Sequence, residues 1–185
     1  MRHPNLPNAV TVARIAVVPL VTHAMLGARE RGGSPALAAA LFNAVALSDV
    51  LDGHLARSRD CETDFGRVVD PLADKALIAG ALAVLVHQRR LARWPAVAIL
   101  ARELAVTGMR AVVGRSGIVV PASRLGKRKT TLQFAAVTAL ILAPDPRAAW
   151  TRLLVHAAVL LTVASGAEYF ARLDASERVE ERPGA

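Results

Sequence analysis

Six apolar stretches, each close to the length that a helix needs to cross a lipid bilayer, dominate the sequence. A spanning helix takes about 20 residues, and 54% of this 185-residue chain is hydrophobic. The stretches are residues 8–27, 35–57, 66–87, 94–113, 130–142 together with the polar residues that precede it, and 147–172. This pattern predicts an all-α integral membrane protein, folded as a bundle of six transmembrane helices.

Composition supports a membrane protein over a water-soluble one. Aromatic residues make up only 4% of the chain, so a soluble core would consist of Ala, Val and Leu. Such residues pack closely as helices in lipid, although a soluble Ala-rich bundle stays open as an alternative. The formal net charge of +8 comes without an aromatic-basic platform, which favours contact with anionic lipid or phosphate and not with nucleic acid. The single cysteine, Cys61, excludes an internal disulfide.

Connectors and charge predict how the chain is organised. Turn residues in 29–34 and 143–146 make successive helices antiparallel neighbours. Residues 1–173 are expected to form the membrane domain, with 1–25 retained as part of it, and 174–185 a charged, disordered tail. If the N-terminus is cytoplasmic, that side holds about twice as many Lys and Arg as the other, so a cytoplasmic-membrane location with both termini inside is expected. Trp94 and Trp150 then fall at the outer ends of their spans.

Four aspartates gather in the second and third stretches, close to the connector that joins them. Asp49 and Asp52 are three residues apart, and Asp70 and Asp74 are four apart, so each pair lies on one face of its predicted helix. Antiparallel neighbours would let the two pairs face each other. Converging carboxylates beside a membrane repel one another unless a divalent cation neutralises them. An all-oxygen ligand set suits Mg²⁺ or Mn²⁺.

The alternative is that these aspartates are ordinary helix-end residues exposed to water. Lys75 beside them favours a site, as do Gly53 and Ala56, because small residues let a nucleotide approach the helix backbone closely. Gly66 could do the same, or it could be a packing or turn glycine.

This region resembles the signature of the CDP-alcohol phosphatidyltransferases, Asp-x2-Asp-Gly-x2-Ala-Arg-x8-Gly-x3-Asp-x3-Asp. All fixed positions are met, by Asp49, Asp52, Gly53, Ala56, Arg57, Gly66, Asp70 and Asp74. Chance would produce such a match in roughly one window in 10⁹. Three further stretches, 5–8, 101–104 and 122–130, resemble the branch of the family whose acceptor is glycerol 3-phosphate. The resemblance covers residues 5 to 133 and implies the family's membrane fold.

The resemblance implies roles for individual residues of the donor site. Two ions, Mg²⁺ or Mn²⁺, would be bridged by Asp49 and Asp70, with Asp52 completing one shell and Asp74 the other. Asp74 would also be the general base for the attacking hydroxyl. The residues implied to bind CDP-diacylglycerol are Asn8, Gly53, Ala56, Arg57, Thr63 and Gly66.

A basic cluster on the same predicted side of the membrane suggests a phosphorylated acceptor. The candidate phosphate-binding residues are Arg110, Arg124, Lys127 and Lys129. Glycerol 3-phosphate fits such cations, whereas the alternative interpretation is a positive-inside anchor for anionic headgroups. Arg102 and Glu103 lie in mid-span, where each is costly unless it is paired or faces a wet cavity.

The implied activity is transfer of the phosphatidyl group from CDP-diacylglycerol to glycerol 3-phosphate, by an enzyme that is a homodimer in contact with membrane lipid. Two alternatives of the same fold would use phosphatidylglycerol, as a cardiolipin synthase does, or an inositol phosphate. From another class, a divalent-cation or proton transporter also clusters acidic residues. A transporter should show broken helices near the bilayer midplane or repeated halves, and the sequence shows neither.

Overall fold

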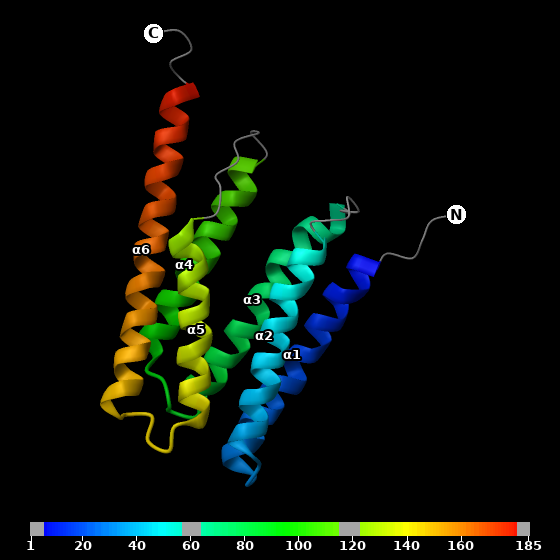
Figure 1. Ribbon diagram of the computed structural model, residues 1–185, viewed down its shortest axis with the longest axis vertical. Helices are drawn as coiled ribbons and strands as arrows, with labels where there is room; N and C mark the ends of the chain where they lie inside the picture. Colours follow the sequence, from blue (N-terminus) through cyan, green and yellow to red (C-terminus); the bar gives the residue numbers. More distant parts are fainter. Residues whose placement is uncertain (1–5, 57–63, 115–122, 181–185) are drawn as a thin grey trace. The chain divides into compact units, whose positions relative to one another are not determined.

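The computed structural model describes the backbone of residues 6–56, 64–114 and 123–180, and the side chains of 16–48, 75–114, 123 and 125–174. Every element in these ranges is an α-helix, and no strand occurs in them. The helices are α1 (Leu6–Glu30), α2 (Pro35–Ala56), α3 (Asp64–His87), α4 (Arg93–Val113), α5 (Arg124–Leu142) and α6 (Ala149–Glu180) (Figure 1). All six predicted helices are therefore confirmed as helices, within a few residues of their expected bounds except where α5 begins and α6 ends.

Local chemistry sets several helix ends. Ser34 precedes α2, and its Oγ accepts a hydrogen bond from the Leu37 backbone N–H at 3.3 Å, while Pro35 occupies the first helical turn, where its missing N–H costs nothing. Gly32, between α1 and α2, has φ of +69°, a conformation that glycine adopts without strain. Ser123 caps the start of α5 in the same way, because its Oγ accepts a hydrogen bond from the Gly126 backbone N–H at 3.0 Å.

The chain divides into two compact units, each with its own packing. The first, residues 1–91 and 137–146, holds α1, α2, α3 and the last residues of α5. In it α1 packs against both α2 and α3. Its core includes Val21, Met25, Phe42, Leu82 and Leu85. Gly80 lets α3 approach α1 closely, because a Cβ there would lie 2.8 Å from Thr22 Cγ2.

Two guanidinium groups cap the end of α5 within the first unit. Arg90 Nε donates to the Leu140 carbonyl at 2.7 Å and its Nη2 to the Ala143 carbonyl, which also accepts from Arg29 Nη2 at 2.9 Å. Burial is the largest cause that lowers the pKa of Arg90, and the positive charge of Arg29 lowers it further. The negative charge of Asp145 partly offsets this lowering. The ordinary arginine pKa is so high that the group stays cationic near neutral pH. Cations at a helix C-terminus donate hydrogen bonds to its free carbonyls and are attracted to the negative end of the helix dipole.

The second unit, residues 92–136 and 147–185, holds α4, the first part of α5, and α6. Here α4 packs against α6, with Val106, Val113, Tyr169 and Leu173 forming a buried cluster. Polar contacts are also present in its interior. Gln133 of α5 donates to the Thr162 hydroxyl of α6 at 2.9 Å, and both side chains are buried.

One helical segment in the described residues, Ala149–Asp174 of α6, is long and apolar enough by itself to cross a membrane. Two shorter apolar segments lie at Pro35–Ser48 and Lys75–His87. The described side chains leave out parts of α1, α2 and α3. The all-helical architecture is confirmed, whereas the crossing of a membrane by all six helices stays a prediction.

The end of the chain differs from the expectation. We expected residues 174–185 to be disordered, but α6 continues through Glu180. The segment 174–180 contains no proline or glycine, and the first breaker is Pro183, so nothing in it opposes a helix. Residues 181–185 lie outside the described residues.

Candidate active site

The four aspartates of the signature all lie in helices of the first unit. Asp49 and Asp52 belong to the last two turns of α2, and Asp70 and Asp74 to the first half of α3. Because both segments are helical, spacings of three and four place each pair on one side of its helix. The start of α1, the end of α2 and the start of α3 lie at the same end of this unit (Figure 1).

The side chains that would form the donor site lie outside the described residues. Among the predicted donor residues, Asn8, Gly53, Ala56 and Gly66 are in helices, and Arg57 and Thr63 fall in the link that the structure does not describe. Within the described side chains, no three His, Cys, Asp or Glu groups come together as a metal site. The convergence of the four carboxylates therefore stays a prediction, supported here by their helical positions.

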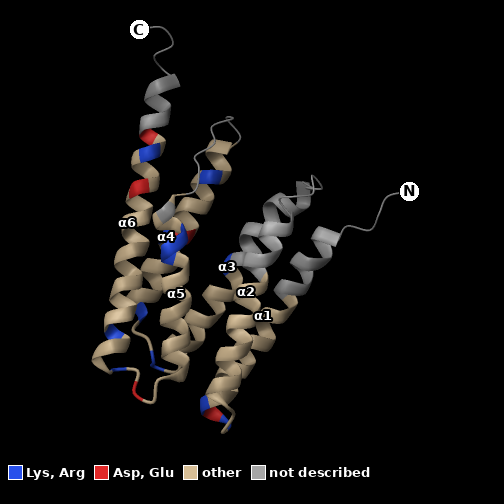
Figure 2. Cartoon of the chain, in the orientation of Figure 1, with Lys and Arg blue, Asp and Glu red and all other residues tan. Residues whose placement is uncertain are grey.

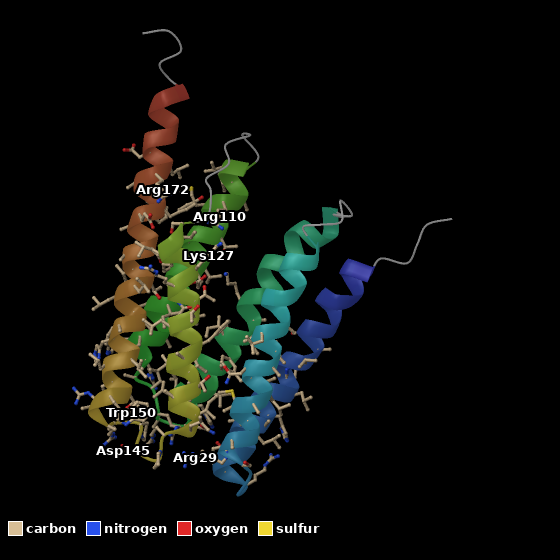
Figure 3. The ribbon with its side chains drawn as sticks, in the orientation of Figure 1. Arg29, Arg110, Lys127, Asp145, Trp150 and Arg172 are labelled. Carbon is tan, nitrogen blue, oxygen red and sulfur yellow. The ribbon has the colours of Figure 1, made fainter. Side chains whose placement is uncertain are left out.

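The second unit brings three cationic side chains to one of its ends. Arg110 comes from the last turn of α4, Lys127 from the first turn of α5 and Arg172 from α6 (Figure 3). The Arg110 guanidinium carbon lies 5.2 Å from the centre of the Tyr169 ring, a cation–π contact. Arg172 Nη2 is 2.5 Å from Glu168 Oε1, one helical turn away.

Predicted acceptor residues differ in their surroundings. Arg110 and Lys127 are exposed, as an anion-binding cation must be before its ligand arrives. Arg124 begins α5, but its side chain lies outside the described residues. Lys129 is 5% exposed, and its ammonium forms an ion pair with the Glu103 carboxylate of α4. The sequence grouped Lys129 with Lys127, and the structure places them in different environments.

Glu103 is at the centre of a charged cluster inside the second unit. Its Oε1 also lies 3.4 Å from Arg102 Nη1. Arg102 fits beside α6 because residue 166 is glycine, where a Cβ would lie 3.1 Å from Arg102 Cγ. The expectation that Arg102 and Glu103 need partners in mid-helix is met by this cluster. Elsewhere the described Lys, Arg, Asp and Glu residues lie mostly near helix ends and in connectors (Figure 2).

Sequence patterns alone do not single out Glu168, Tyr169 and Arg172 as neighbours of the cationic end. The spacing of four between Glu168 and Arg172 is the available signal for their ion pair, whereas the contact of Tyr169 with Arg110 depends on how α4 packs against α6.

Comparisons with known proteins agree with the signature. Residues 4–164 match the family model described as CDP-alcohol phosphatidyltransferase. A Bacillus subtilis (strain 168) protein named CDP-diacylglycerol–glycerol-3-phosphate 3-phosphatidyltransferase is 40% identical over 182 residues, covering 91% of this chain and 94% of its own. A Rickettsia felis protein of the same name is 35% identical over 171 residues, covering 90% and 93%.

A third relative, from Mycobacterium tuberculosis (strain ATCC 25618 / H37Rv), is named "Probable phosphatidylglycerophosphate synthase". It is 40% identical over 170 residues, which cover 91% of this chain and 81% of the relative. The family model spans most of the chain, and it includes the helices that carry the four aspartates. The chain belongs to the CDP-alcohol phosphatidyltransferase family.

Proposed function

We propose that this protein transfers the phosphatidyl group of CDP-diacylglycerol to glycerol 3-phosphate, forming phosphatidylglycerophosphate and CMP. The observation that carries the proposal is the complete eight-residue signature, whose four aspartates lie on two neighbouring helices of one unit. Relatives that cover most of the chain are named for this reaction.

Asp49, Asp52, Asp70 and Asp74 would hold two divalent cations. The donor set fits Mg²⁺ or Mn²⁺ because it consists of carboxylates alone. When bound, such ions neutralise the pyrophosphate of CDP-diacylglycerol and stabilise the charge on departing CMP. Arg57 supplies a further positive charge for the donor phosphates. Asn8, Gly53, Ala56, Thr63 and Gly66 are proposed to line the nucleotide site.

Asp74 is the proposed proton acceptor. In the transfer, an oxygen of the glycerol 3-phosphate hydroxyl forms a bond to the phosphatidyl phosphorus, and the bond from that phosphorus to the CMP oxygen breaks. The hydroxyl proton passes to the Asp74 carboxylate, and CMP leaves with the bonding electron pair. A carboxylate next to a cation is a weak base, so its contribution depends on positioning.

The acceptor's phosphate is proposed to bind Arg110, Arg124 and Lys127. Exposure of Arg110 and Lys127 at one end of the second unit supports this assignment. A dianionic phosphate accepts several charge-assisted hydrogen bonds, which strengthen binding over that of a neutral alcohol. An acceptor without a phosphate would leave these cations unmatched.

We also propose that all six helices cross the cytoplasmic membrane and that the active site faces the cytoplasm, in an enzyme that acts as a homodimer. Support comes from the second unit, where the exposed Trp94 and Trp150 lie at the start of their helices and Arg110 and Arg172 lie toward the other end (Figure 3). From Trp150 to Arg172, α6 rises about 33 Å, close to the thickness of the hydrocarbon layer. Aromatic residues at one boundary and cations at the cytoplasmic one are typical of membrane helices.

The direct test is CMP release by purified protein in detergent, with CDP-diacylglycerol and Mg²⁺ or Mn²⁺. Glycerol 3-phosphate, phosphatidylglycerol and inositol phosphate are compared as acceptors, and a chelator removes the metal. Metal-dependent release with glycerol 3-phosphate alone is the expected result. Release with a different acceptor would retain the donor site and change the acceptor, whereas no release with any acceptor from folded protein would refute the proposed function.

A further inference from the structure

The Glu103–Lys129 pair joins two helices at a place where isolated charges are costly. Glu103 lies in the middle of α4 and Lys129 in the second turn of α5, and their side chains are 4% and 6% exposed. Losing one partner of such a pair leaves a buried charge uncompensated, which costs far more than the pair itself contributes. The contact therefore constrains where α5 can lie against α4.

A second polar contact constrains the same face of α5. Gln133 follows Lys129 by four residues, so the two lie one above the other on the helix. Gln133 Nε2 donates to Thr162 Oγ1 at 2.9 Å, and that hydroxyl donates to the Ala158 carbonyl at 2.6 Å. The start of α5 is thus attached to α4 through Lys129 and to α6 through Gln133. Together these contacts fix the rotation of α5 about its own axis.

That rotation determines where the exposed cation of α5 points. Lys127 precedes Lys129 by two residues, which is about 200° around a helix. The buried and exposed lysines consequently lie on nearly opposite sides of α5, in agreement with the exposed state of Lys127 and the burial of Lys129.

We propose that Glu103 and Lys129 are positioning residues, and that their ion pair holds the start of α5 in the rotation that presents Lys127 to the acceptor's phosphate. Lys129 is then no ligand of the acceptor. The inference rests on the proposed function for the role of Lys127, but the ion pair and its effect on the helix do not depend on which acceptor is used.

Arg102 makes the two partners unequal. Its Nη1 lies 3.4 Å from the carboxylate that binds Lys129, and its Nε is buried without a hydrogen-bond partner. Removal of the Glu103 charge leaves two cations together, whereas removal of the Lys129 charge leaves Glu103 beside Arg102. Glu103→Gln is therefore expected to be more damaging than Lys129→Gln.

The experiment measures five variants of the full chain in detergent: Glu103→Gln, Lys129→Gln, the double variant that carries both changes, Lys129→Arg and Lys127→Gln. Each is assayed for its thermal midpoint, for kcat and for KM with glycerol 3-phosphate. Each single change of the pair is expected to lower the midpoint by on the order of 10 °C and to raise KM several-fold. The double variant should recover at least half of both losses of Glu103→Gln, because it removes one of the two cations that Glu103→Gln leaves together.

Lys127→Gln is the matched control, because it removes the same charge two positions away on the exposed side. It should raise KM for glycerol 3-phosphate by about tenfold, with the midpoint unchanged. Lys129→Arg, which retains the charge, should restore both properties. A Glu103→Gln protein that does not fold, next to a double variant that does, would support the ion pair equally.

Three results would overturn the proposal: a Lys129→Gln protein with a raised KM and an unaltered midpoint, a double variant no better than the worse single one, or Lys129→Arg failing to rescue. If the unaltered protein shows no turnover with glycerol 3-phosphate, the proposed function fails by itself. The thermal midpoints of the five variants would still decide whether the ion pair holds α5.

Discussion

Asp74 has to meet two requirements in the proposed mechanism, since it binds a cation and accepts a proton. Both depend on the negative charge of its carboxylate and on its place in α3, one turn after Asp70. An amide in its place has nearly the same size and also fits a helix, but it carries no charge and accepts no proton. Replacement by asparagine therefore separates the chemistry of this residue from its contribution to packing.

Asp74→Asn is expected to lower kcat by a factor of at least about 10², the usual contribution of a positioned general base. CMP release in detergent measures it, and size-exclusion chromatography checks that the variant is folded. Asp174→Asn, at an exposed position of α6, is the control and should leave kcat unaltered. Near-complete activity of Asp74→Asn would contradict the assigned role.

At the scale of helices, small residues decide how closely neighbours approach. Gly80 of α3 faces α1, where a Cβ would lie 2.8 Å from Thr22 Cγ2. That side chain has little room to move, because its hydroxyl donates to the Val18 and Pro19 carbonyls at 3.0 Å each. Gly108 of α4 has no such neighbour within 4 Å. Comparing an alanine substitution at Gly80 with one at Gly108 therefore separates the effect of packing from that of helix propensity.

Gly80→Ala is expected to be less stable than Gly108→Ala by about 1–3 kcal/mol, the usual cost of overpacking. Both changes gain roughly the same helix propensity, up to about 1 kcal/mol, so their difference isolates the contact between α1 and α3. Thermal midpoints in detergent provide the comparison. Equal midpoints for the two variants would mean that α1 and α3 are not held at this separation.

Sequence patterns were sufficient to predict the helices, but not which face of each helix is buried. Apolar runs separated by Gly, Pro and charged connectors fixed six helices to within a few residues, apart from the start of α5 and the end of α6. The signature placed all four aspartates correctly within helices. Lys127 and Lys129 looked alike because the face that α5 buries depends on α4 and α6. Glu103 could be expected to need a partner, but its choice of Lys129 comes from tertiary packing.

At the scale of the whole molecule, the polar clusters bear on the membrane topology. Within the described residues, Arg102 and Glu103 interrupt the apolar run of α4. A charge in mid-helix is tolerated in lipid when it is paired inside the protein, and these two residues are paired. Their presence is therefore compatible with α4 crossing the membrane.

The single cysteine provides a direct test of the proposed topology. Cys61 follows α2 in sequence, and Ser34 precedes it. If α2 crosses the bilayer, its 22 residues rise about 33 Å and separate these two positions by the full hydrocarbon layer. A membrane-impermeant maleimide should label Cys61 in inside-out vesicles but not in intact cells. The Cys61→Ser/Ser34→Cys variant should show the reverse. Labelling of both cysteines from one side would mean that α2 does not cross the membrane. Labelling of Cys61 in intact cells alone would mean that the protein has the opposite orientation to the proposed one. The acidic signature would then face away from the cytoplasm, and so away from a water-soluble acceptor made there.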